Sequence, residues 1–208
     1  MNLPETIRAI QRTLGVTVDG SFGPATAMAA WRALNRNAED AEVAERGAED
    51  LDAEGLDARS VKTLATLDPK ARGMFGQFLR LAKATAATLG CEYVLIGGNR
   101  TWAEQDALYA QGRTLPGARV TNARGGYSHH NFGIAGDCGV FMGGSYLDES
   151  NPRLAARVHK ACSLHAGRCG LEWGGGWNSI KDLPHYEVAK LLDMAQRRRI
   201  YEAKGSIL

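Results

Sequence analysis

An acidic stretch in the first third of this 208-residue chain most constrains how the chain can fold. Residues 39–57 carry nine acidic side chains and one basic one, so their net charge is −8 and the rest of the chain carries +10. Alanine and glutamate favour a helix here, but the apolar residues are too few to dock it firmly on a core. The chain is therefore predicted to have three parts: a small unit over residues 1–36, an acidic linker or helix over 37–54, and a larger domain over 55–208.

The segment before the acidic stretch has the pattern of two short helices around one turn. Residues 4–14 place their apolar side chains on one helical face. Asp19-Gly20 marks a turn, and Gly23-Pro24 begins the second helix. Helices this short bury little apolar surface, so this small helical unit is expected to depend on a neighbouring domain or a partner.

The larger domain combines helix and strand patterns without regular alternation. Asp68-Pro69 fits the N-cap and first position of a long helix that ends at Leu89-Gly90. Thr101 and Glu104 form a capping box at the start of a shorter helix. We therefore predict an α+β fold in which helices flank a small antiparallel sheet. The predicted strands lie within residues 93–98, 132–141, 171–173 and 185–188, and further helices begin at Asn151 and near the C-terminus.

Two segments of the larger domain carry residues suited to a metal. SHHNFGIAGD, residues 128–137, places His130 in a loop seven residues before Asp137 on a strand, and DLPH ends at His185. Two histidines and one aspartate leave a fourth position for water, which is typical of a catalytic zinc site. The donor set suits zinc without excluding other divalent metals, and the spacing alone does not separate ligands from surface histidines.

These segments resemble the D-alanyl-D-alanine carboxypeptidase and L-alanyl-D-glutamate endopeptidase family of zinc peptidases. SHHNFGIAGD fits the pattern S-x-H-x-x-G-x-A-x-D of that family, and GGNRTWAEQDALYAQGRT, LEWGGGW and DLPHYE fit its other motifs. The endolysin-like branch, which cleaves L-Ala–D-Glu bonds in the stem peptides of peptidoglycan, is the most similar. Near the N-terminus, IQRTLGVTVDGSFGPATAMAAW resembles the first half of peptidoglycan-binding domains, although their second half is not clear here.

The resemblance implies roles for individual residues. Asp182 occupies the acidic place of the acid-x-x-His element and is expected to be the general base that takes a proton from zinc-activated water. Arg100 matches the arginine that stabilises the scissile carbonyl, although Asn99 stands before it where relatives have tyrosine or a similar residue. The expected zinc ligands are His130, Asp137 and His185.

Substrate contacts are expected from Ser128, Arg113 and Trp173. The D-Glu of the stem peptide keeps a free carboxylate, which suits a bidentate arginine or the serine hydroxyl. Trp173 fits a cleft wall and core packing equally well, and so does Trp177.

Neighbouring residues have simpler interpretations. His129 is expected to face the loop or the substrate rather than the metal. Glu172 is a candidate second base, but a structural role is favoured. Cys138 follows Asp137 on a strand and should point to the opposite face of the sheet. The four cysteines form no C-x-x-C pair, so a cysteine zinc cluster is not expected.

Charge and hydropathy bear on partners and location. There is no run of 18 apolar residues, and residues 1–11 lack the apolar core of a secretory signal, so neither membrane insertion nor signal-directed export is expected. The positive charge outside the acidic stretch suits an anionic polymer, and the motifs favour peptidoglycan over nucleic acid. We therefore predict a monomeric phage or prophage endolysin that is made in the host cytoplasm and released to the periplasm or cell wall by a holin-type pore-former.

Two other functions fit the same sequence. A D-alanyl-D-alanine carboxypeptidase would share the fold and differ in how much peptide fits beyond the scissile bond. A non-catalytic wall-binding protein would keep the fold with an inactive metal site, but the presence of all three candidate ligands and of Asp182 argues against it.

Overall fold

The computed structural model describes residues 3–14, 18, 55–178, 180–189 and 192–208, which form parts of two compact units, Met1–Glu54 and Gly55–Leu208. In the first unit, α1 (Leu3–Leu14) confirms the predicted first helix, with Ile7 partly buried and Ile10 exposed. The predicted second helix and the acidic stretch 37–54 lie outside the described residues.

Local capping signals set the starts of two helices in the second unit. The long helix α5 (Pro69–Ala87) begins as predicted, since the Asp68 side chain accepts a hydrogen bond from the backbone N–H of Lys70. The shorter α6 (Trp102–Ala110) begins with the predicted capping box of Thr101 and Glu104. The other α-helices described in this unit are α4 (Ala58–Leu64), α7 (Leu147–Ser150), α8 (Pro152–Ser163) and α9 (Met194–Lys204).

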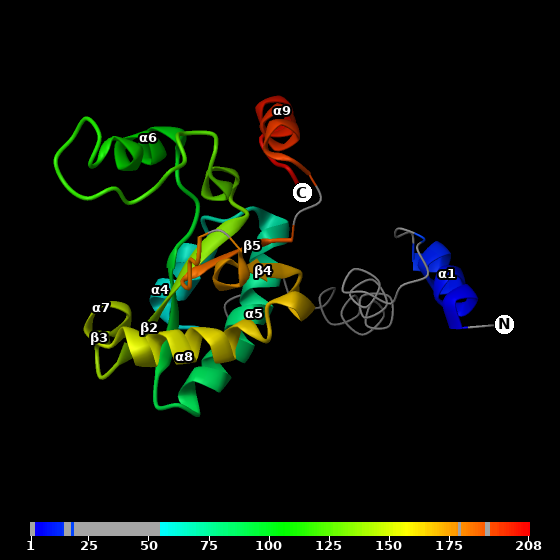
Figure 1. Ribbon diagram of the computed structural model, residues 1–208, viewed down its shortest axis with the longest axis horizontal. Coiled ribbons are helices and arrows are strands. Elements are labelled where there is room, and N and C mark those ends of the chain that lie inside the picture. The colour runs from blue at the N-terminus through cyan, green and yellow to red at the C-terminus, as the bar shows by residue number, and fades with distance from the viewer. Residues whose placement is uncertain (1–2, 15–17, 19–54, 179, 190–191) are drawn as a thin grey trace. The chain divides into compact units, whose positions relative to one another are not determined.

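The strands form one antiparallel sheet in the order β1-β2-β5-β4, with β3 paired to β2. This arrangement confirms the predicted α+β class (Figure 1). The strands are β1 (Glu92–Gly97), β2 (Ala135–Met142), β3 (Ser145–Tyr146), β4 (Leu171–Trp173) and β5 (His185–Val188). Short 3-10 helices lie between them: η1 (His129–Phe132), η2 (Gly167–Cys169) and η3 (Gly174–Gly176).

The predicted strand over residues 132–141 begins later than expected. Residues 129–132 curl into η1, which ends at Gly133 with a left-handed φ of 67°. A Cβ atom at Gly133 would lie 2.7 Å from the backbone N of Asp68, so only glycine fits there without a shift. Strand β2 starts at Ala135, and His130 therefore lies on η1, just before the strand.

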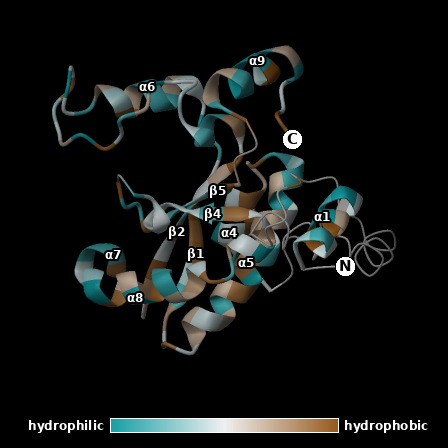
Figure 2. Ribbon diagram, turned by 45° about the vertical axis from the view of Figure 1, so that its right-hand side comes forward, coloured by the Kyte–Doolittle hydropathy of each residue, from teal (hydrophilic) through white to brown (hydrophobic). Residues whose placement is uncertain are grey.

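Alternation along the strands gives the sheet one core face and one polar face. Helices α5 and α8 pack against each other and against strands of the core face, and Figure 2 shows hydrophobic residues gathered where β1 and β2 meet α5. Cys138 belongs to this core, as predicted, so its neighbour Asp137 points the other way. Core side chains from the strands are Tyr93, Leu95, Cys138, Val140, Leu171, Tyr186 and Val188.

All four cysteines are buried and free. Burial raises the pKa of the Cys162 thiol to about 12 and that of the Cys138 thiol well above its ordinary value, so both pack as neutral side chains. Within the described ranges, no helix combines the length and apolar character needed to span a membrane.

Candidate active site

The centre of the site contains two residues that are paired on adjacent strands and a third that comes from a 3-10 helix. Asp137 on β2 is the direct antiparallel partner of His185 on β5, and its Oδ1 lies 3.2 Å from Nδ1 of His185. His130 comes from η1, just before β2, and its Nε2 lies 3.4 Å from Oδ2 of Asp137. One ligand atom from each of the three side chains lies within 4.8 Å of the others, so the structure brings the predicted zinc ligands together.

An acceptor outside this centre holds each imidazole ring in place. Nδ1 of His130 lies 2.7 Å from the carbonyl oxygen of Gly98, and Nε2 of His185 lies 3.1 Å from Oε2 of Glu187. When these outer nitrogens donate their protons, the inner nitrogens keep their lone pairs toward the centre. Both rings are therefore oriented as metal ligands need to be.

The electrostatics of the centre favour a positive charge. Burial alone raises the pKa of Asp137, but His130 and His185 outweigh it and hold that pKa well below its ordinary value. Burial alone lowers the pKa of His185, but Asp137 and Glu187 raise it to about 9. A divalent cation meets the same demand for positive charge. Two imidazole nitrogens and one carboxylate, without a thiolate, fit zinc with a position left for water or substrate.

Arg100 lies beside this centre, as its predicted role requires. Its Nη2 is 3.9 Å from Oδ2 of Asp137, and its Nη1 donates a hydrogen bond of 2.7 Å to Oε1 of Gln105. The Gln105 side chain is fully buried, and its Nε2 donates to Oγ1 of Thr121 and the carbonyl of Ala123. Gln105 thus fixes the guanidinium, a role that the sequence analysis missed because its only signal is a place on the helix after Arg100.

Asp182 lies in the turn that leads into β5. Its backbone N–H donates to the carbonyl of Gly174 at 3.2 Å, and its carbonyl accepts from the N–H of His185 at 3.4 Å. The residue is exposed, yet partial desolvation of its carboxyl raises the pKa above the ordinary value against the opposing effect of His185. A raised pKa makes a carboxylate a better proton acceptor, which agrees with the predicted role of general base.

The turn at Asp182 depends on a glycine, and we expect Gly174→Ala to disturb it. A Cβ atom at Gly174 would lie 2.6 Å from the carbonyl oxygen of Asp182 and 3.1 Å from Cβ of His185. The free energy of unfolding should fall by about 1–3 kcal/mol, and zinc affinity should fall as His185 moves. Thermal denaturation and chelator competition measure the two effects. Gly167→Ala is the control, because an added Cβ there meets nothing within 4 Å; equal behaviour of both variants would contradict the account.

A pocket opens next to His185. Ser128, a predicted substrate contact, lines it together with His129 and Glu187. Trp177 also lines it, and its ring centroid lies 5.1 Å from that of His185. Of the two candidate tryptophans, Trp177 therefore lies at the pocket wall and Trp173 does not.

Two other predicted substrate contacts lie outside this pocket lining. The Arg113 guanidinium lies 3.8 Å over the Tyr109 ring and donates to the Tyr109 carbonyl. Trp173 is partly buried against the core, and its Nε1 donates to the carbonyl of Leu183 at 2.7 Å. Trp173 thereby supports the turn between Asp182 and His185.

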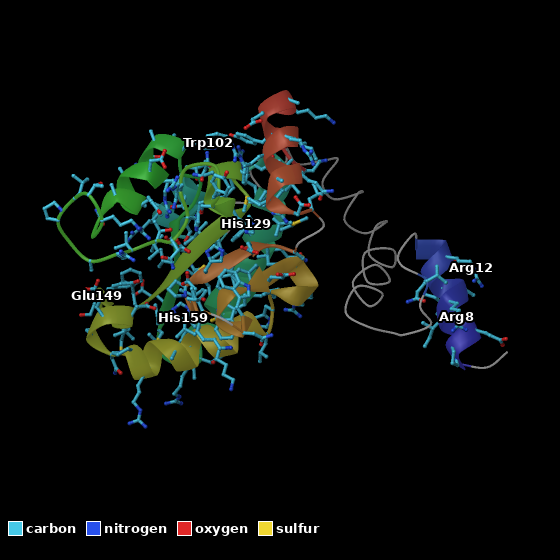
Figure 3. All side chains as sticks on the ribbon, turned by 45° about the horizontal axis from the view of Figure 1, so that its top comes forward. Arg8, Arg12, Trp102, His129, Glu149 and His159 are labelled. Atoms are coloured by element: carbon cyan, nitrogen blue, oxygen red, sulfur yellow. The ribbon has the colours of Figure 1, made fainter. Side chains whose placement is uncertain are left out.

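Glu187 is the main candidate residue that the sequence analysis missed. It follows His185 by two positions on β5, so alternation alone places both side chains on the polar face. Glu187 is buried, and its Oε2 contacts the rings of His129 and His185. In Figure 3, His129 lies across the sheet from the labelled His159, which belongs to the core side.

Comparison with known proteins agrees with this site. Residues 121–188 match the family described as D-alanyl-D-alanine carboxypeptidase. Over 111 residues the chain is 40% identical to the peptidoglycan L-alanyl-D-glutamate endopeptidase CwlK of Bacillus subtilis (strain 168). That alignment covers 51% of this chain and 66% of the relative, just under two thirds of its length.

Two solved structures also resemble the chain. The L-Ala D-Glu endopeptidase ChiX of Serratia marcescens is 24% identical with a TM-score of 0.45, over 64% of this chain and 87% of that one. The vancomycin resistance D,D-pentapeptidase VanY, solved as a mutant with Zn(II), is 16% identical with a TM-score of 0.41, over 67% of this chain and 80% of that one. The similarity to the family rests on the sequence match over residues 121–188. The matched segment contains His130, Asp137 and His185, so the candidate metal site lies within the part of the chain that is similar to the D-alanyl-D-alanine carboxypeptidase family.

Proposed function

We propose that this chain is a zinc-dependent peptidoglycan endopeptidase that hydrolyses the L-Ala–D-Glu bond of stem peptides. The observation that carries the proposal is the convergence of His130, Asp137 and His185 next to a pocket and to Arg100. The choice of bond is supported by the identity to the Bacillus subtilis relative, which is named for cleavage of that bond.

Different residues of the chain have separate roles in hydrolysis. When bound, zinc lowers the pKa of water and polarises the scissile carbonyl. Asp182 accepts a proton as water adds to the carbonyl carbon and returns it to the amine as the C–N bond breaks. The guanidinium of Arg100, held by Gln105, stabilises the negative charge that develops on the carbonyl oxygen. Trp177 and Ser128 provide walls for the peptide at the pocket.

A D-alanyl-D-alanine carboxypeptidase is the second candidate, because the matching family carries that description. Mass spectrometry of purified peptidoglycan after digestion separates the two. The endopeptidase leaves glycan strands whose stem peptides are shortened to L-Ala, and it releases peptides that begin with D-Glu. Loss of terminal D-Ala alone would instead support the carboxypeptidase. Binding to sacculi without any cleavage by the zinc-loaded chain would support the third candidate, a wall-binding protein.

The N-terminal segment is proposed to bind the cell wall. We expect deletion of residues 1–36 to leave a folded and active peptidase, because the residues proposed for catalysis all lie within Gly55–Leu208. Hydrolysis of a soluble peptide should be unchanged, while hydrolysis of whole sacculi should weaken because tethering raises the local enzyme concentration. Pelleting with sacculi measures the binding, and unchanged binding after the deletion would contradict a wall-binding role.

The biological setting stays a prediction. We propose an endolysin, released by a holin-type pore-former, on the basis of the motif resemblance to the endolysin-like branch. Lysis of cells that express both the chain and a pore-former, but not of cells that express the chain alone, would support this role.

A further inference from the structure

A single buried carboxylate joins a metal ligand to a second imidazole at the pocket. Glu187 is 1% exposed and lies on β5, between β2 and β4, where it pairs with Ala135 on one side and Glu172 on the other. Pairing on both sides restrains the backbone of the strand, while burial and the contacts with His129 and His185 restrain the Glu187 side chain. Its carboxylate therefore has a fixed position on the polar face of the sheet.

Both imidazoles contact the same oxygen of this carboxylate. Oε2 of Glu187 lies 3.1 Å from Nε2 of His185 and forms a short hydrogen bond with Nδ1 of His129. His185 belongs to the metal-binding group and His129 does not, although His129 precedes the ligand His130 directly. The carboxylate thus holds His129 beside the metal-binding group without making it a member of that group.

His129 also lines the pocket that opens next to His185. With Nδ1 engaged by Glu187, only its Nε2 is left to bind a polar group of a peptide in that pocket. We propose that Glu187 is a positioning residue that fixes His185 for zinc and holds His129 against the substrate beside the metal. This inference rests on the proposed function for the identity of the substrate, but not for the effect on zinc.

The zinc arm of the test compares two carboxylates on neighbouring strands. Glu187→Ala should weaken zinc binding about 10–100-fold in a chelator competition, because His185 loses the acceptor that orients it. Glu187→Gln keeps the volume and one acceptor oxygen, so it should recover part of that affinity. Glu172→Gln is the matched control, since Glu172 pairs directly with Glu187 across the strands, and it should bind zinc like the unaltered chain. Absorption of the cobalt-substituted protein should change for Glu187→Ala and not for the control.

The substrate arm uses a background without turnover. In zinc-loaded Asp182→Asn, calorimetry measures binding of a soluble stem peptide that contains the L-Ala–D-Glu bond. Adding His129→Ala should raise the Kd about tenfold while zinc affinity stays within about twofold, as expected for loss of one hydrogen bond to substrate. Adding Glu187→Gln should raise the Kd as well, by a smaller factor.

The outcomes separate this inference from the proposed function. Unchanged zinc affinity in both Glu187 variants would overturn the positioning role, and if Glu187→Ala does not fold, the Glu187→Gln value decides. An unchanged Kd with His129→Ala would overturn the substrate contact. A zinc-loaded chain that binds no stem peptide would contradict the proposed function and the His129 contact together, while the zinc affinities would still decide the role of Glu187 toward His185.

Discussion

Asp182→Asn is expected to lower kcat on a soluble stem peptide by about 10²–10⁴, the usual contribution of a general base. The substitution keeps the shape of the side chain and removes its ability to accept a proton. The backbone contacts of the turn, from Gly174 to Asp182 and from Asp182 to His185, do not involve the carboxylate. Folding and zinc content should therefore stay close to those of the unaltered chain.

The same substitution at a second carboxylate controls this experiment. Glu172→Gln removes an acid from β4 on the polar face of the sheet and should cost far less activity. Zinc must be quantified in the same preparations. An active Asp182→Asn together with an inactive, zinc-bound Glu172→Gln would show that the base is assigned to the wrong carboxylate. Loss of zinc in Asp182→Asn would place Asp182 among the metal ligands and contradict the three-ligand account.

Removal of one metal ligand is expected to abolish zinc binding and hydrolysis together. His130→Ala and His185→Ala each leave two protein ligands, which is fewer than a catalytic zinc site uses. Each also leaves Asp137 in the centre without one of the imidazoles that hold its pKa low. Zinc measured by elemental analysis and kcat measured on the same samples should fall in parallel to background.

His159→Ala is the control for loss of a histidine. This residue is fully buried on the core side, where its Nδ1 contacts the Tyr93 hydroxyl and its Nε2 lies 2.6 Å from Oδ1 of Asp148. Its loss should lower the temperature of unfolding and leave zinc content near one ion per folded chain. Retention of zinc by both ligand variants would contradict the proposed site.

The sequence predicted those elements of the fold that have strong local signals. The N-cap at Asp68 and the capping box at Thr101 set the starts of α5 and α6, because a side chain satisfies backbone N–H groups only a few residues away. Helix α4 has 7 residues and strand β3 has 2, so neither shows a periodic pattern. The predicted start of β2 is wrong because the residues before it form η1. This 3-10 helix ends where Gly133 closely approaches the backbone of Asp68, a contact that the local sequence does not reveal.

The candidate ligands followed from the motifs, but their convergence did not follow from spacing. The pairing of Asp137 with His185 depends on the register between β2 and β5, which tertiary contacts decide. Glu187 was available from simple alternation along β5. The position of Arg113 over the Tyr109 ring cannot be predicted from alternation, because that contact depends on how the segment after α6 folds back.

The most direct test of the central claim measures zinc and bond cleavage in one preparation. The 208-residue chain is stripped of metal with a chelator, shown to be metal-free by elemental analysis, and then titrated with zinc while purified peptidoglycan is digested. The account predicts no hydrolysis in the metal-free protein, recovery that saturates near one zinc per chain, and new D-Glu amino termini in the mass spectra of the products. Full hydrolysis by the verified metal-free protein would contradict it.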